Sequence, residues 1–330
     1  MDRQLMRLPL ELIFQVMTSL LPGNPYAVIP APHPATQLLV AFSLVSRATH
    51  EIAVRELRRH CLYLDSDRRL SRFLLCLEAS RQSRTQLPSV FQDITSLYLA
   101  PFGRSLDNLP TAEWTRELFC YTRESLRRLI VDIPFDSLPP WDDHLNVGPV
   151  LREGFAQLTK LEEFVCTRDA VRFDMGDDPS EQLQPVLQQW PRLRRLGLYR
   201  PMCSERFWGC LANLPNLEHA VLTTPLAITS TSVDVGSFPT WRAERPITVV
   251  LAQNTSEALL RTSLAFSAFP AGLADENRKM KQMMRIMTYR IPRLEGSGTG
   301  VELGSSWLMR TALDGELWGV RGYPLTGPLS

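Results

Sequence analysis

The chain has 330 residues, of which 44% are hydrophobic and 22% charged, which is ordinary for a globular protein with room for two or three domains. Its 36 Lys and Arg against 35 Asp and Glu leave a net charge of +1 without a dense basic block, so neither nucleic acid nor a membrane is expected as a partner. The first apolar stretch is too short to span a bilayer, and the six cysteines form no CxxC pair. These features predict a reducing compartment, the cytoplasm or the nucleus.

The first predicted element is a short helix in the segment LPLELIFQVMTSLLP. It should begin near Pro9, because proline lacks the N–H that would be without a partner in the first helical turn. Its few polar residues form one narrow stripe, and apolar residues cover the rest of its surface. One covered face would bury only part of that apolar surface, so the helix is predicted to be buried from two sides.

Two further helices are predicted before residue 60. Five prolines between residues 22 and 34 rule out a continuous helix and suggest an exposed loop. Apolar residues at helical spacing resume near Ala35 and continue to about His60, with Ser46 as the predicted N-cap of the third helix. Three helices of this length make a small core, so the surplus apolar surface indicates a partner.

Two segments of this N-terminal region carry a family resemblance. LPLELIFQVMTSL is similar to the Leu-Pro-x-Glu-Leu opening of the F-box, and LLVAFSLVSRATHEIA is similar to its Leu-rich middle and Val-Ser/Cys-Arg/Lys segment. Together with RHCLYLDSDRRLSRFLLCL, the segments resemble filamentous-fungal F-box proteins. The proline-rich insertion is longer than usual, and the third helix lacks the tryptophan that many members have.

The resemblance implies docking on the Skp-type adaptor, and through it on the cullin, of a ubiquitin ligase, while the rest of the chain presents a protein substrate. The alternative is that the same residues are only the core of an N-terminal helical cap. By position, the expected adaptor-binding residues are Leu8, Pro9, Leu12, Ile13, Val16, Leu20, Leu44 and Val45.

After the helices one pattern recurs, with apolar residues at its first, fourth and sixth positions. Five copies end at Leu99, Val131, Cys166, Leu198 and Leu222. The alternation predicts a short strand in each copy, and helical segments lie between the copies. The pattern resembles a leucine-rich repeat, although the units are long and lack the asparagine expected after the strand. It implies an irregular α/β solenoid with parallel strands in a curved sheet.

The outward positions of these strands are the predicted substrate surface, and the alternative is a solvated sheet face without a ligand. Ser96, Ile130, Glu163, Val165 and Val221 are among these outward positions. The residues expected to bind substrate are Tyr98, Arg128, Arg195, Tyr199 and His219.

The expected domains are an F-box-like helical domain at 1–60, the solenoid at 61–255 and a helical capping region at 256–330. In the last of these, DENRKMKQMMRIMTYR is predicted to form a docked helix and GSGTGVELGSSW a flexible linker. Trp307 and Trp318 are predicted to pack on the last strand as part of a closing element.

The sequence contains no strong enzyme motif. The glycines at 296, 298 and 300 lack the Gly-Lys-Ser/Thr ending of a phosphate loop, and the acidic segments WDDH and DMGDD lack calcium-loop spacing. We therefore expect a non-catalytic protein without metal or cofactor. The predicted function is substrate recognition in a Skp/cullin/F-box ubiquitin ligase. The alternatives are a repeat scaffold for protein–protein interaction with no ligase role and a hydrolase whose site forms only in three dimensions.

Overall fold

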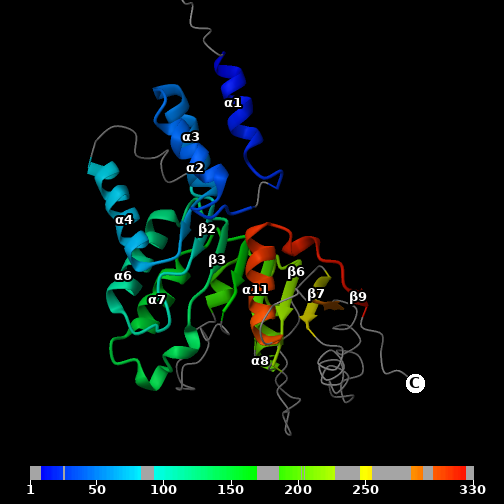
Figure 1. The fold of residues 1–330 in the computed structure, drawn as a ribbon. Helices are drawn as coiled ribbons and strands as arrows, with labels where there is room; N and C mark the ends of the chain where they lie inside the picture. Colours follow the sequence, from blue (N-terminus) through cyan, green and yellow to red (C-terminus); the bar gives the residue numbers. More distant parts are fainter. Residues whose placement is uncertain are drawn as a thin grey trace, which may run out of the picture.

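The structure, a computed structural model, describes residues 9–24, 27–82, 93–168, 186–201, 203, 205–226, 246–254, 284–292 and 300–324. Within these residues the centre of the fold is one sheet of nine strands that lie in the order of the sequence (Figure 1). Strands β1 to β8 each pair in parallel with the next, and β9 pairs antiparallel with β8. The predicted α/β class with a mostly parallel sheet is confirmed.

Five of the strands coincide with the five predicted copies of the apolar pattern. The pairing aligns equivalent positions, so that Leu97 lies beside Leu129, and Leu129 beside Phe164. The strand bounds are β1 Tyr63–Leu64, β2 Ser96–Leu99, β3 Arg128–Val131, β4 Glu163–Cys166, β5 Arg195–Tyr199, β6 His219–Thr223, β7 Ile247–Gln253, β8 Met284–Arg290 and β9 Tyr323–Pro324.

Helices precede the sheet and lie between several of its strands, with α11 between β8 and β9. The first three form a unit at one end of the molecule (Figure 1), and they begin and end close to the predicted positions. Ser46 caps the third helix as expected, because its Oγ accepts a hydrogen bond from the Thr49 N–H while Thr49 Oγ1 accepts one from the Ser46 N–H. The α-helix bounds are α1 Leu10–Ser19, α2 Pro34–Ser43, α3 Arg47–His60, α4 Asp67–Gln82, α6 Leu109–Thr122, α7 Val147–Ala156, α8 Glu205–Ala212 and α11 Gly300–Leu313.

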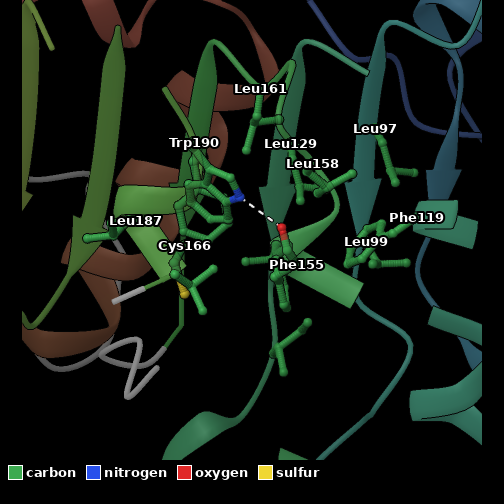
Figure 2. Packing of buried hydrophobic residues seen from close by; sticks show 14 of the residues in the cluster. Leu97, Leu99, Phe119, Leu129, Phe155, Leu158, Leu161, Cys166, Leu187 and Trp190 are labelled. Carbon is green, nitrogen blue, oxygen red and sulfur yellow. Dashed lines mark hydrogen bonds between the residues drawn. The ribbon is translucent and has the colours of Figure 1, made fainter. Parts of the chain in front are cut away.

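One face of the sheet packs against α4, α6, α7 and α8 and contains the largest buried cluster. Trp190 is fully buried there, and its Nε1–H donates to the Phe155 carbonyl oxygen at 2.8 Å (Figure 2). Its ring centroid lies 4.8 Å from that of Phe164. The repeat leucines and isoleucine expected in this core are all at most 1% exposed, namely Ile94, Leu97, Leu126, Leu129, Leu161, Leu193 and Leu196.

The opposite face of the sheet is covered by the C-terminal helix α11 and the short helix Leu317–Gly319 (Figure 1). Two glycines permit the close approach. A Cβ on Gly304 would lie 2.9 Å from the Thr224 Oγ1, and one on Gly197 would lie 3.2 Å from the Leu317 Cδ2. The sheet therefore carries helices on both faces, and it is buried on both faces along most of β2 to β6.

This arrangement corrects two predictions for the C-terminal region. The predicted linker GSGTGVELGSSW is helical from Gly300 onward, because the helix is stabilised by packing on the sheet rather than by its own composition. Trp307 stacks on Tyr289 of β8 with ring centroids 5.4 Å apart, as expected for packing on a late strand. Trp318 does not pack on a late strand. Its ring lies over β5 instead, where the ring centroid is 5.9 Å from the guanidinium carbon of Arg195.

The predicted methionine-bearing helix is wrong where the structure describes it. Met284 and Met287 belong to strand β8, which pairs with β7 along seven residues. Pairing with an existing strand overrides the helical spacing of the methionines. Met280 and Met283 lie outside the described residues. The sheet therefore continues through β8 and β9 into residues 256–330, for which a helical capping region was expected.

The proline-rich loop between α1 and α2 is exposed only in part, although its composition suggests an exposed loop. Ala27, Val28 and Ile29 are buried. The Val28 N–H donates to the Leu313 carbonyl at 2.8 Å, and the Ile29 N–H donates to the carbonyl of the last residue of α3. The loop thus joins the N-terminal helices to the end of α11.

Candidate functional site

The helices α1, α2 and α3 share a very small core. The buried apolar cluster that they share consists of Met17, Leu39 and Ala53, with Ile13 and Phe42 among the partly buried side chains that pack around these three. A unit of this size buries a limited share of its apolar surface, as the sequence indicated.

The same helices expose a large amount of apolar surface. In the connection between α2 and α3, Leu44 is 83% exposed and Val45 is 68% exposed, while Leu12 and Val16 on α1 are each 46% exposed. The α2–α3 connection lies at the end of the unit that points away from the sheet, as does the beginning of α1 (Figure 1). Exposed apolar residues in such number on one unit are typical of a surface that binds another protein. We call the exposed residues Leu10, Leu12, Val16, Leu38, Val40, Leu44 and Val45 the apolar end surface.

Five of the residues predicted to bind an adaptor are exposed, and two are not. Ile13 and Leu20 are half-buried, and Ile13 packs against the Met17 core because it lies on the inner side of α1. Leu8 lies outside the described residues. The exposed members of the set are Pro9, Leu12, Val16, Leu44 and Val45.

The predicted substrate surface on the strands is not an exposed face. Tyr98, Arg128 and Tyr199 are at most 4% exposed because α11 and the segment after it cover them, and Arg195 and His219 are half-buried. The expectation of an open ligand surface is therefore wrong for the first three residues. A signal was present in the sequence, since apolar residues occupy outward as well as inward positions, which is typical of a sheet buried on both faces.

Charged residues lie in two neighbouring rows across the beginnings of the strands. In the inner row Arg128 pairs in register with Glu163, and Glu163 pairs with Arg195. The outer row contains the residues just before each strand, which are Arg127, Glu162, Arg194 and Glu218. Opposite charges directly across from one another stabilise adjacent strands.

The inner row is anchored by Arg128. Its Nε donates to the Glu163 Oε1, and its Nη2 donates to the carbonyl oxygen of Ala312 in the last turn of α11. A cation is favourable at this position because the carbonyls of a helix C-terminus carry partial negative charge. The second carboxylate oxygen of Glu163 lies 3.6 Å from the Arg195 Nη1. Arg128 and Glu163 thus join the sheet to the covering helix.

The outer row is more accessible, and it holds one loose and one close ion pair. The Arg127 Nε lies 3.7 Å from the Glu162 Oε1, whereas Arg194 makes three hydrogen bonds of 2.9 to 3.2 Å to the Glu218 carboxylate. Between the rows lies a pocket of about 250 Å³. It is lined by Thr95, Ser96, Arg127, Arg128, Glu162, Glu163, Arg194 and Arg195, and we call it the arginine pocket.

Burial shifts the pKa of several groups on or beside the strands. Desolvation, with the neighbouring Arg195, lowers the pKa of His219, so the imidazole is neutral at pH 7. Desolvation also raises the pKa of Asp132 and that of Tyr98, whose hydroxyl donates to the Asp132 Oδ2 at 3.5 Å. Tyr98 in turn stacks on Tyr63 with ring centroids 4.2 Å apart.

Comparison with protein-family models, with curated proteins and with solved structures gives no match to this chain. Within the part of the chain that the structure describes, no helix is long and apolar enough to cross a membrane. Over the same residues, no group of three His, Cys, Asp or Glu side chains is arranged to hold a metal ion.

Proposed function

We propose that this protein is a substrate-recognition subunit of a Skp/cullin/F-box ubiquitin ligase, in which α1 to α3 bind the Skp-type adaptor. The observation that carries the proposal is the apolar end surface on a unit whose own core is very small. One side of α1 carries Met17, which packs with Leu39 and Ala53 of the other two helices. The other side leaves Leu12 and Val16 exposed. This is the condition expected of a helix that a partner covers from the second side.

The energetic case rests on the side chains with the highest exposure. Full burial of a leucine or valine side chain contributes about 1.5–3 kcal/mol, so covering Leu44 and Val45 is a substantial gain for a complex. The same two residues match the Val-Ser-Arg segment of the F-box resemblance. Because they lie in a connection rather than inside the core, they can take part in binding without being needed for folding.

The remaining part of the proposal concerns the strands. Sequential parallel strands with helices between them support a leucine-rich-repeat-like solenoid, in which repeat units stack and bury a common core. Since α11 covers the face that carries Tyr98 and Tyr199, a protein substrate would bind at the accessible edge of the sheet near Arg194 and Arg195, or on outer surfaces of the helices.

The test replaces Leu44 and Val45 together by serine and measures co-purification with the Skp-type adaptor. We expect the full-length variant to lose binding by at least about thirtyfold, because truncated apolar anchors each commonly cost about 2 kcal/mol. Its circular dichroism and melting temperature should stay unchanged. Leu75→Ser is the matched control, since Leu75 is 63% exposed but lies on α4.

Three results would contradict the proposal: the parent does not bind the adaptor, the double variant binds as well as the parent does, or Leu75→Ser weakens binding equally. The helical-cap alternative predicts a different outcome. If α1 to α3 serve only to close the sheet in a repeat scaffold without a ligase role, neither the parent nor the serine variant should bind the adaptor above background.

A further inference from the structure

We propose that the arginine pocket binds a phosphate group or a similar small oxyanion, presented either as a free anion or on a phosphorylated side chain. The pocket lies at the beginnings of β2 to β5 and is separate from the apolar end surface. Anion binding in this pocket is therefore independent of adaptor binding. No motif in the sequence marks the pocket as a site.

Positive charge predominates among the side chains that line the pocket. The lining contains four arginines and two glutamates, Glu162 and Glu163. Arg128 and Glu163 are almost fully buried, and charges attract one another more strongly where water is excluded. An anion is therefore favourable beside these arginines.

Hydrogen-bonding capacity also favours an acceptor-only ligand. A guanidinium presents five N–H donors and no acceptor, so the arginines of the lining match a ligand that only accepts hydrogen bonds. Thr95 and Ser96 place two hydroxyl groups beside the guanidinium groups. A phosphate oxygen accepts several hydrogen bonds at once, and arginine matches its geometry in bidentate fashion. A cation or a neutral donor would meet the same groups unfavourably.

The shape of the pocket fits a small group that enters from solvent. Its volume of about 250 Å³ corresponds to roughly eight water molecules at their share of liquid volume, enough for a phosphate with part of a side chain. Arg194 is 54% exposed and marks the open side. Arg128 is held in place by Glu163 and Ala312, so a ligand meets an arginine that is already positioned.

The experiment uses the full-length protein and three probes: inorganic phosphate, O-phosphoserine in a short peptide, and the same peptide with unmodified serine. Binding is measured by calorimetry and by the melting temperature, against sodium chloride of equal ionic strength. The pocket variant is Arg127→Gln. The matched control is Arg123→Gln, which also removes a guanidinium that lies 3.6 Å from a glutamate but lies outside the pocket.

We expect saturable binding of inorganic phosphate, of the phosphopeptide or of both, and none of the serine peptide. Arg127→Gln should weaken binding about tenfold or more, because it removes a charged hydrogen-bond donor, and Arg123→Gln should leave it unchanged. Tighter binding of the phosphopeptide than of phosphate identifies a phosphorylated partner, and equal binding identifies a free anion.

The proposal is overturned if neither phosphate probe binds saturably, if the serine peptide binds as well as the phosphopeptide, or if both variants lose binding equally. Arg127→Lys provides a second variant should the glutamine variant melt at a lower temperature. It keeps the charge but loses the bidentate geometry, so binding should fall between that of the parent and that of Arg127→Gln.

Discussion

The strand region and the N-terminal helical unit use their apolar residues in opposite ways. Along β2 to β6 the sheet is covered on both faces, and the apolar residues of the repeats are almost completely buried within the chain. In α1 to α3 the buried apolar cluster contains only Met17, Leu39 and Ala53, while Leu44 and Val45 remain exposed. The strand region therefore gains stability from its apolar residues, whereas the helical unit has apolar surface that can contribute to binding.

A sequence pattern of apolar residues therefore does not by itself separate core from interface. Burial of apolar area stabilises by about 25 cal/mol per Å² in either case, and the tertiary arrangement decides whether the chain itself or a partner supplies the covering surface. Substitutions that create cavities should therefore have large effects in the strand region and small, local effects in the helical unit.

The largest predicted effect is that of Trp190→Ala in the strand region. The change leaves a cavity beside Phe155 and Phe164 and removes the hydrogen bond to the Phe155 carbonyl, so unfolding should become easier by about 3–5 kcal/mol. Chemical denaturation followed by circular dichroism measures this. Trp141→Ala is the control, since Trp141 is 72% exposed and its loss should change stability by less than about 0.5 kcal/mol.

A smaller effect is predicted for Met17→Ala in the helical unit. Met17 is fully buried, but the core around it is small and can collapse around the missing side chain. The free energy of unfolding should therefore fall by about 2 kcal/mol. Hydrogen exchange should accelerate in α1 and α2 while the amides of β3 to β5 keep their protection. Uniform acceleration in both regions would show that the two regions unfold as one unit and would remove the basis of the comparison.

The smallest predicted effect is a pH dependence that arises from Asp132. Desolvation raises the pKa of this carboxyl in the folded state above its ordinary 3.8, so the folded protein holds the proton more tightly than the unfolded chain does. The resulting stabilisation is complete below pH 3.8 and is lost as the pH rises through the folded-state pKa. Denaturation midpoints measured from pH 3.5 to 7 should therefore decline less steeply for Asp132→Asn than for the parent. A steeper decline in the variant would contradict this assignment.

Much of the strand region could be predicted from the sequence because its signal is local and repeated. The spacing of Leu97 and Leu99, of Leu129 and Val131, and of Leu196 and Leu198 places a strand in each repeat, and the structure has one there. The helix boundaries at Pro9 and Ser46 follow from capping preferences that involve only neighbouring residues.

The candidate sites were less predictable, for reasons that depend on distant parts of the chain. Leu12 and Ile13 are adjacent and equally apolar, yet only Ile13 packs on the Met17 core, because its position on the helix faces α2 and α3. The arginine pocket unites residues from four strands, and no short motif signals such a set. Arg128 was interpreted as a surface residue because the helix that covers it lies 184 positions later in the chain.

The α/β class, the positions of the strands in the repeats and the three N-terminal helices can be predicted from the amino-acid sequence, since they follow from periodicity and capping within a few residues. Long-range packing places α11 over the sheet, buries part of the proline-rich loop against Leu313 and makes Met284–Arg290 the strand β8. The physical reason is that short segments with weak intrinsic preferences adopt the conformation that buries their apolar side in the place available to them.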